Sequence, residues 1–141
     1  MTGGDPAAGP VAVLVVAPSA PVRLAAAAAL AEAGRRRNRA VHVTESGDGF
    51  DALWRFPRGL FDVVVTALSL PTLTGLDLIR LLRARPERGS LVIIAIPGDS
   101  ADEKAATAVG AICLPMPMDA DALERALLGA GVFGDGRGAG C

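Results

Sequence analysis

Short, mostly apolar runs alternate with helical segments along this chain, and no other feature constrains its fold as strongly. Runs of this length and composition are typical of strands buried on both faces of a sheet. The expected strands are residues 11–16, 41–44, 62–66, 91–96 and 111–114. The expected helices are residues 21–33, 50–56, 76–84, 100–109 and 119–128. Strict alternation with short connections predicts an α/β fold, a five-stranded parallel sheet with helices on both faces, in the strand order 2-1-3-4-5.

Capping residues predict where several helices begin and end. Gly34 follows the first helix at the C′ position, and Pro57 stops the second. The segment Ser100–Glu103 has the form of a capping box that opens the fourth helix. Asp119 is a suitable N-cap for the last helix.

The length of 141 residues fits one domain with its own core. We expect a flexible leader at residues 1–10, a globular domain at 11–130 and a disordered glycine-rich tail at 131–141. Hydrophobic residues make up 51% of the chain, and small alanine and valine side chains carry much of this content, as close-packed strands and helices require. No signal peptide is indicated, and no apolar stretch approaches the roughly 20 residues of a membrane span.

The charge balance limits the partners that we expect. A net charge of -1 gives no general attraction to nucleic acid or to an anionic membrane, and an aromatic content of 4% provides poorly for base stacking. Two cysteines, Cys113 and Cys141, are too few for a disulfide framework, so a reducing cytoplasm fits better.

Ordered motifs give the chain a resemblance to bacterial response-regulator receiver domains over about residues 11–128. The matching motifs are Val13-Leu-Val-Val16 with Arg23, Gly47-Asp-Gly-Phe-Asp-Ala-Leu53, Phe61-Asp62 with Leu70-Pro71 and Gly75, and Gly110-Ala111 with Met116-Pro117. The resemblance implies a flavodoxin-like (βα)5 three-layer sandwich. In such a sheet the site lies at the carboxyl ends of the first and third strands, where the strand order reverses.

The site residues depart from the receiver pattern at every chemically required position. The resemblance implies two acidic residues after the first strand, where this chain has Ala17 and Pro18, and a phosphoacceptor aspartate at the end of the third strand, where it has Ala67. It also implies a hydroxyl residue at the end of the fourth strand, where this chain has Ile96, and a lysine before a proline, where it has Met116. An aromatic switch position matches Cys113 loosely. Phosphoryl transfer needs a carboxylate nucleophile, oxygen ligands for Mg²⁺ and a cation for the developing charge. We therefore expect a vestigial, apolar pocket with no catalytic residue, metal or cofactor, and no response to Mg²⁺.

Other carboxylates and polar residues offer weaker alternatives. Asp62 lies near the start of its strand, too far from the carboxyl edge, and Asp99 alone makes a poor Mg²⁺ site. His42 and two distant cysteines form no metal constellation. The run from Arg35 to Arg39 either grips an acidic partner or is a solvated loop, and the second interpretation is favoured. Four hydroxyl residues are expected in loops near the pocket: Ser19, Ser69, Thr72 and Thr74. They are either targets of a Ser/Thr kinase or form hydrogen bonds to the backbone, and the second interpretation is favoured.

Two functions remain open, and neither is enzymatic. The first is a stand-alone, aspartate-less receiver that signals through phosphorylation-independent protein contacts or a self-dimer. The resemblance implies the face of the fourth helix, fifth strand and fifth helix, with Asp102, Glu103, Lys104, Cys113, Asp121, Glu124 and Arg125. The second is a small-ligand sensor whose pocket is lined by Ser19, Leu68, Ile96 and Met116. The Met116-Pro117 peptide matches one that receivers often hold cis, although trans is the default.

Overall fold

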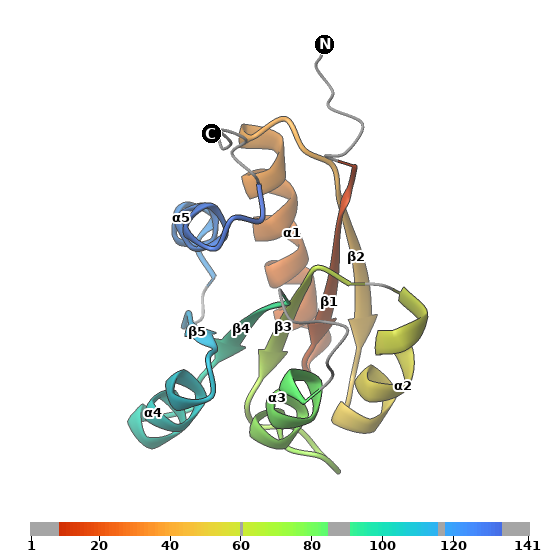
Figure 1. The fold of residues 1–141 in the computed structure, drawn as a ribbon, viewed down its shortest axis with the longest axis vertical. Coiled ribbons are helices and arrows are strands. Elements are labelled where there is room, and N and C mark those ends of the chain that lie inside the picture. Colours follow the sequence, from red (N-terminus) through yellow and green to blue (C-terminus); the bar gives the residue numbers. More distant parts are fainter. Residues whose placement is uncertain (1–8, 60, 85–90, 116–117, 134–141) are drawn as a thin grey trace.

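The computed structural model describes residues 9–59, 61–84, 91–115 and 118–133. Its strands are β1 (Val11–Val16), β2 (Val41–Ser46), β3 (Val63–Ala67), β4 (Val92–Ile96) and β5 (Ile112–Cys113). Its helices are α1 (Ala20–Arg36), α2 (Gly49–Gly59), α3 (Gly75–Arg83), α4 (Ser100–Ala108) and α5 (Ala120–Gly129). All strand pairs are parallel and the order is β2-β1-β3-β4-β5, so the predicted fold class is confirmed (Figure 1).

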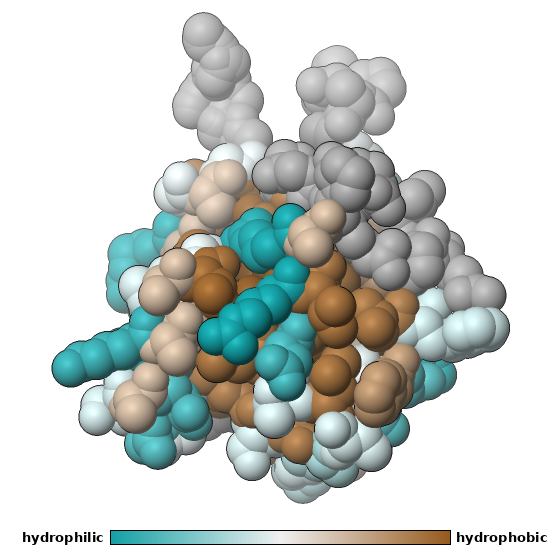
Figure 2. All heavy atoms as spheres, turned by 60° about the horizontal axis from the view of Figure 1, so that its bottom comes forward, coloured by the Kyte–Doolittle hydropathy of each residue, from teal (hydrophilic) through white to brown (hydrophobic). Residues whose placement is uncertain are grey.

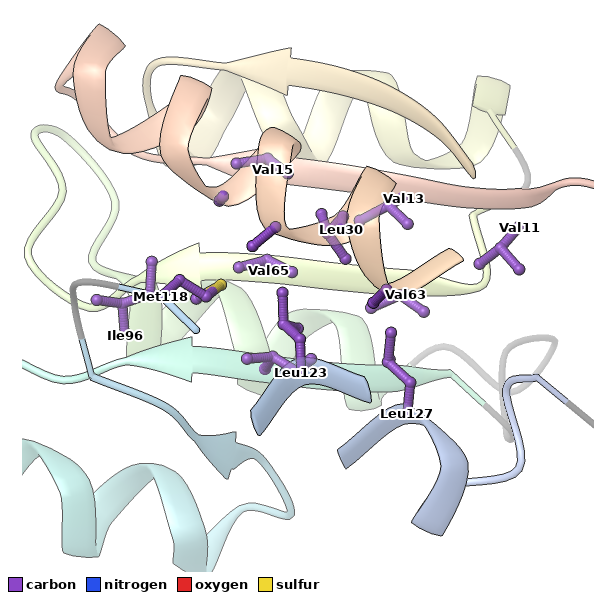
Figure 3. Packing of buried hydrophobic residues seen from close by; sticks show 14 of the residues in the cluster. Val11, Val13, Val15, Leu30, Val63, Val65, Ile96, Met118, Leu123 and Leu127 are labelled. Carbon is purple, nitrogen blue, oxygen red and sulfur yellow. The ribbon is translucent and has the colours of Figure 1, made fainter. Parts of the chain in front are cut away.

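The sheet separates two hydrophobic clusters, and each is covered by its own set of helices. Alternate residues of β1 point to opposite faces, so Val13 and Val15 join the cluster under α1 and α5 while Leu14 and Val16 join the cluster under α2, α3 and α4. Figure 3 shows the first cluster, in which Leu30 of α1 and Leu123 of α5 pack on the valines of β1 and β3. Each such fully buried side chain contributes about 1.5–3 kcal/mol.

The first helix runs further than the sequence pattern predicts. Gly34 lies within α1 and not at its C′ position, and the helix ends at Arg36. A Cβ atom on Gly34 would lie 2.5 Å from Cγ2 of Val41 and 2.7 Å from the carbonyl oxygen of Arg39. The glycine is therefore needed for close packing of the helix on β2, and the left-handed residue of the connection is Asn38, at a φ of 60°.

Three further boundaries differ from the expected ones. The second helix continues through Pro57 to Gly59, because a proline this close to the helix end removes one backbone donor without preventing the last turn. The N-cap of α4 is Asp99 and not Ser100, since its side chain accepts from the backbone N–H of Asp102 at 2.8 Å. The predicted N-cap of α5, Asp119, is confirmed by its bond from the N–H of Asp121.

Both ends of the described chain are tied to the domain. Val132 and Phe133, which the sequence pattern assigns to the tail, pack on the α1 and α5 cluster, and Phe133 is buried. Phe133 is buried because its side chain is large and apolar. The sequence pattern misses this, because the high glycine content of the segment indicates disorder. No helix among the described residues has the length and apolar character that crossing a bilayer demands.

Candidate functional site

The carboxyl ends of β1, β3 and β4 meet at one edge of the sheet, toward which the strand arrows of Figure 1 point downward. Ala17 and Pro18 follow β1, Ala67 ends β3 and Ile96 ends β4. Ala67 and Ile96 are direct partners in the parallel register. The structure therefore brings four of the five predicted pocket residues to one edge, while Met116 lies outside the described residues.

Alkyl groups fill this edge. Ala17 and Ile96 are buried, Ala67 is half-buried and Pro18 is exposed. Figure 3 shows Met118 beside Ile96 at the carboxyl end of β4, within the same cluster. With this edge turned forward, Figure 2 shows apolar surface in the middle of the face, crossed by a few hydrophilic side chains. These alkyl groups provide neither a nucleophile nor a metal ligand.

The connection from β3 to α3 folds tightly back over the strand end. The N–H of Leu68 donates to the carbonyl oxygen of Ile96 at 3.1 Å, and the N–H of Gly75 donates to the carbonyl oxygen of Leu68 at 3.1 Å. The buried hydroxyl of Thr66 donates to the carbonyl oxygen of Ala67 at 2.9 Å. The backbone around Ala67 is thus held from both sides, although its side chain has no reactive group.

Arg23 also lies at this edge, although the sequence motifs place it only at the start of the first helix. Its Nη1 donates to the carbonyl oxygen of Ala17 at 2.6 Å, and its Nε pairs with Oε1 of Glu45 at 3.0 Å. The expected apolar pocket therefore has a guanidinium group at its rim. The signal available in the sequence is that Arg23 is the only charged residue in the first three turns of an apolar helix.

Asp62 and Asp99, the two carboxylates weighed as alternatives, both have local hydrogen-bond partners. Asp62 lies at the amino end of β3, where its Oδ2 accepts from the N–H of Ala12 at 2.9 Å. Asp99 caps α4. The position of Asp62 at the amino end of β3 agrees with the prediction from strand position, while Asp99, in the loop after β4, is used as a helix cap.

The residues expected on the interaction face divide into two groups. Glu103 and Lys104 are exposed along a shallow hollow on α4, and Arg125 is exposed on α5. Asp102 also lies on α4, and Cys113 of β5 is a half-buried free thiol whose Sγ is 3.6 Å from the carbonyl oxygen of Glu103.

Asp121 and Glu124 face α1 instead. The guanidinium of Arg36 pairs with Asp121 and lies 3.3 Å from Oε1 of Glu124, while Nε of Arg37 lies 2.7 Å from Oε2 of Glu124. The pKa of Arg36 is raised, first by its hydrogen bond to Asp121 and then by the bond to Glu124. These contacts join the two helices of one face of the sheet.

The same contacts correct the interpretation of the arginine run as a solvated loop. Arg35 and Arg36 form the last turn of α1, and Arg37 binds α5. Arg39 donates from Nη1 to the carbonyl oxygen of Phe133 at 3.2 Å and from Nη2 to that of Gly9 at 2.8 Å. Charge spacing alone does not reveal these partners. The carboxylates of α5 are more than eighty residues away in the sequence, and the partners of Arg39 are backbone carbonyl oxygens.

The remaining candidates have local roles. Ser19 and Thr74 cap α1 and α3 through their hydroxyls, which is the favoured prediction for these loop residues. Ile96 and Leu68, proposed to line a ligand pocket, are buried, so they offer a ligand little free surface. His42 is exposed on β2, and the described residues contain no cluster of three or more potential metal-ligating side chains.

The geometry defines a doubly wound α/β domain, with Ala17, Ala67 and Ile96 at the topological switch point of its sheet. No protein-family model matches the chain. Solved structures do match it. The chemotaxis response regulator CheY4 of Vibrio cholerae has 25% identity over 85% of this chain and 98% of its own, with a TM-score of 0.71. A response regulator receiver protein from Pseudomonas putida has 26% identity over 86% and 98%, with a TM-score of 0.68.

A response regulator receiver domain protein from Clostridium thermocellum shows the same fold, with 22% identity over 85% of this chain and 93% of its own and a TM-score of 0.72. These similarities confirm the resemblance that the sequence motifs indicate. The chain is a divergent receiver-like domain.

Proposed function

We propose that this domain acts in signal transduction through protein contacts and without phosphoryl transfer at the end of β3. The observation that carries the proposal is the register pair of Ala67 and Ile96, with Ala17 directly after the neighbouring strand β1. Acyl-phosphate formation requires a carboxylate oxygen to attack phosphorus, and a methyl group has no lone pair for this step.

Mg²⁺ binding is disfavoured for a second reason. The guanidinium of Arg23 lies at the rim of the site on the carbonyl oxygen of Ala17, and it would repel a divalent cation there. Mg²⁺ sites in proteins depend on one or two carboxylates, which Ala17 and Pro18 do not supply. The domain should therefore be insensitive to the metal as well as to phosphodonors.

The contact surface that we propose is the exposed side of α4, β5 and α5. Glu103, Lys104 and Arg125 give it both signs of charge, which suits a specific protein contact more than a general electrostatic one. Asp121 and Glu124 contribute less than the sequence suggests, because arginines of α1 already pair with them. A reducing compartment such as the cytoplasm fits the half-buried free thiol of Cys113.

The test of phosphorylation independence is incubation with acetyl phosphate and Mg²⁺, and separately with beryllofluoride. We expect no mass increase of a phosphoryl group, no change in intrinsic Trp54 fluorescence and no change in oligomeric state, beside a phosphorylatable receiver as positive control. A Mg²⁺-dependent rise in melting temperature or a stable phosphoryl adduct would contradict the proposal.

The contact surface is tested by affinity capture from the native host. The double variant Glu103→Lys with Arg125→Glu should lose partners that the wild-type chain retains. The matched control is Asp77→Lys on the exposed side of α3, which should retain them. Equal recovery by all three chains would exclude this surface.

A further inference from the structure

Arg23 lies near the start of α1, where a cation does not stabilise the helix itself. Its backbone N–H makes the first hydrogen bond of the helix, to the carbonyl oxygen of Ser19 at 3.1 Å. The positive end of the helix dipole is at this terminus, so acidic side chains are favourable there and basic ones are not. The first turn of α1 holds no acidic residue to compensate. The position of Arg23 is therefore explained by contacts outside α1.

The guanidinium of Arg23 joins the carboxyl ends of two strands. Its Nη1 donates to the carbonyl oxygen of Ala17, directly after β1, at 2.6 Å, and its Nε donates to Oε1 of Glu45 in β2 at 3.0 Å. A Cβ atom on Gly47, in the connection from β2 to α2, would lie 3.7 Å from Nη1. One side chain therefore contacts both the β1–α1 and the β2–α2 connection.

The peptide groups of Ala17 are paired on both sides in this arrangement. The N–H of Ala17 donates to the carbonyl oxygen of Ser46 at 3.0 Å, and its carbonyl oxygen accepts from Arg23. Ala17 is 1% exposed, and an unpaired backbone oxygen in such a buried place is costly. In an open parallel sheet this edge is where ligands bind. At β1 the domain supplies the hydrogen-bond donor from its own chain.

The pair of Arg23 and Glu45 differs from the other ion pairs of the described residues. Those pairs lie within single helices or join the end of α1 to α5. The side chain of Arg23 is only 20% exposed, and a desolvated charge is strongly unfavourable once it loses its partner. Arginine suits the position because its planar fork presents separate N–H groups to two acceptors, whereas lysine is a single point charge.

We propose that Arg23 is a tethered cation that clamps the carboxyl ends of β1 and β2, and that the two acceptors it occupies form a binding site for a guanidinium ion. The clamp, formed by Arg23, Ala17 and Glu45, holds the two connections in one arrangement without a ligand. Removal of the Arg23 side chain leaves the carbonyl oxygen of Ala17 and the carboxylate of Glu45 unpaired. A free guanidinium compound has the charge and the planar donor geometry to bind both.

The clamp is a separate inference from the proposed function. The absence of phosphoryl transfer is carried by Ala67 and Ile96 and is measured by the mass of the chain, whereas the clamp is measured by stability and by hydrogen exchange. Failure of the clamp would leave an unphosphorylated domain, and a phosphoryl adduct would leave the contacts of Arg23 in place. The two failures are therefore distinguishable.

Thermal unfolding of Arg23→Ala tests the binding site. The variant should melt about 5 °C or more below the wild type, because it leaves a carboxylate and a buried carbonyl oxygen unpaired. Methylguanidinium chloride at about 10 mM should recover at least about 2 °C of this loss. The wild type, whose site is filled, should gain nothing. Arg55→Ala, which breaks an exposed pair within α2, is the matched control and should gain nothing either.

Three results would overturn the binding site. The first is a wild-type melting temperature for Arg23→Ala. The second is an equal gain from sodium chloride or magnesium chloride at the same concentration, which would show an effect of ionic strength or of any cation. The third is an equal gain from methylguanidinium in all three proteins.

Hydrogen exchange separates the clamp from a general loss of stability. In Arg23→Met, which keeps an apolar side chain of similar length, the N–H of Ala17 should exchange at least about tenfold faster than in the wild type. The N–H of Val11 donates to the carbonyl oxygen of Ala40 at 2.9 Å, at the amino end of the same strand pair. It is the internal control and should change less than about twofold. Equal acceleration of both amides, or no change at Ala17, would overturn the clamp.

Discussion

Gly75 at the start of α3 lies directly against the carbonyl oxygen of Ala67. A Cβ atom on Gly75 would be 2.2 Å from that oxygen and 2.6 Å from the Cα atom of Leu68. No side chain fits there, so the glycine is what permits the connection to return over the end of β3. The tight connection beside Ala67 therefore depends on a glycine at position 75, although the Ala67 side chain itself has no reactive group.

Gly75→Ala is therefore expected to destabilise the domain by about 1–3 kcal/mol, because the nearest atoms belong to backbone that must shift. Chemical denaturation measures the change. The control is Gly129→Ala at the end of α5, where a Cβ atom meets nothing within 4 Å; its stability should stay the same or rise by up to about 1 kcal/mol. Equal stability of the two variants would show that the β3–α3 connection adapts freely.

Ala67→Asp should fold but should not restore phosphorylation. The half-buried side chain leaves room for a carboxylate, yet Ala17 and Pro18 still supply no Mg²⁺ ligand and Arg23 remains at the rim. We expect fewer than about 1% of the protein molecules to carry a phosphoryl group after incubation with acetyl phosphate, as measured by intact-mass spectrometry. Stoichiometric, Mg²⁺-dependent modification would mean that the neighbouring positions matter less than we propose.

Glu124→Gln should lower the melting temperature by about 2–4 °C at low salt. The carboxylate is 17% exposed and accepts from both Arg36 and Arg37, so its loss weakens the attachment of α5 to α1. The difference from wild type should narrow in 1 M salt, which screens charge pairs. Glu103→Gln on the exposed face of α4 is the matched control and should leave the melting temperature unchanged.

The pH dependence of stability should include a contribution from Asp51. The pKa of this carboxyl is lowered, first by the hydrogen bond from Arg55 and then by that from Ser46. A lowered pKa in the folded state stabilises the fold above the pKa of the unfolded chain, about 3.9, and this stabilisation is lost as the pH falls through the folded value. Arg55→Met should reduce this acid-dependent loss, as measured by denaturation between pH 6 and pH 2 in comparison with wild type.

The fold was predictable because its signals are local. The three central strands, β1, β3 and β4, are rich in valine and isoleucine, and Asp119 caps its helix as its position indicates. The alignment of Ala17, Ala67 and Ile96 at one edge follows from parallel topology alone, since the carboxyl ends of parallel strands share an edge.

The side-chain contacts at the candidate site and between α1 and α5 could not be predicted, because they join segments that are distant in the sequence. Arg23 turns back to the end of β1, and Arg36 and Arg37 cross to α5, more than eighty residues along the chain. A run of arginines has the same appearance in sequence whether it is solvated or paired. The sequence context of Gly34 indicates a helix end, because the packing of Val41 against this glycine is visible only in the fold.

Arg39 holds the carbonyl oxygens of Gly9 and Phe133 with one guanidinium group. The two ends of the described chain therefore lie within reach of one side chain, at the opposite end of β1 from the Ala67 edge (Figure 1). A short peptide linker between these ends would close the domain into a ring. New termini could then be opened in the exposed turn at Gly98, giving a circular permutant with the same sheet.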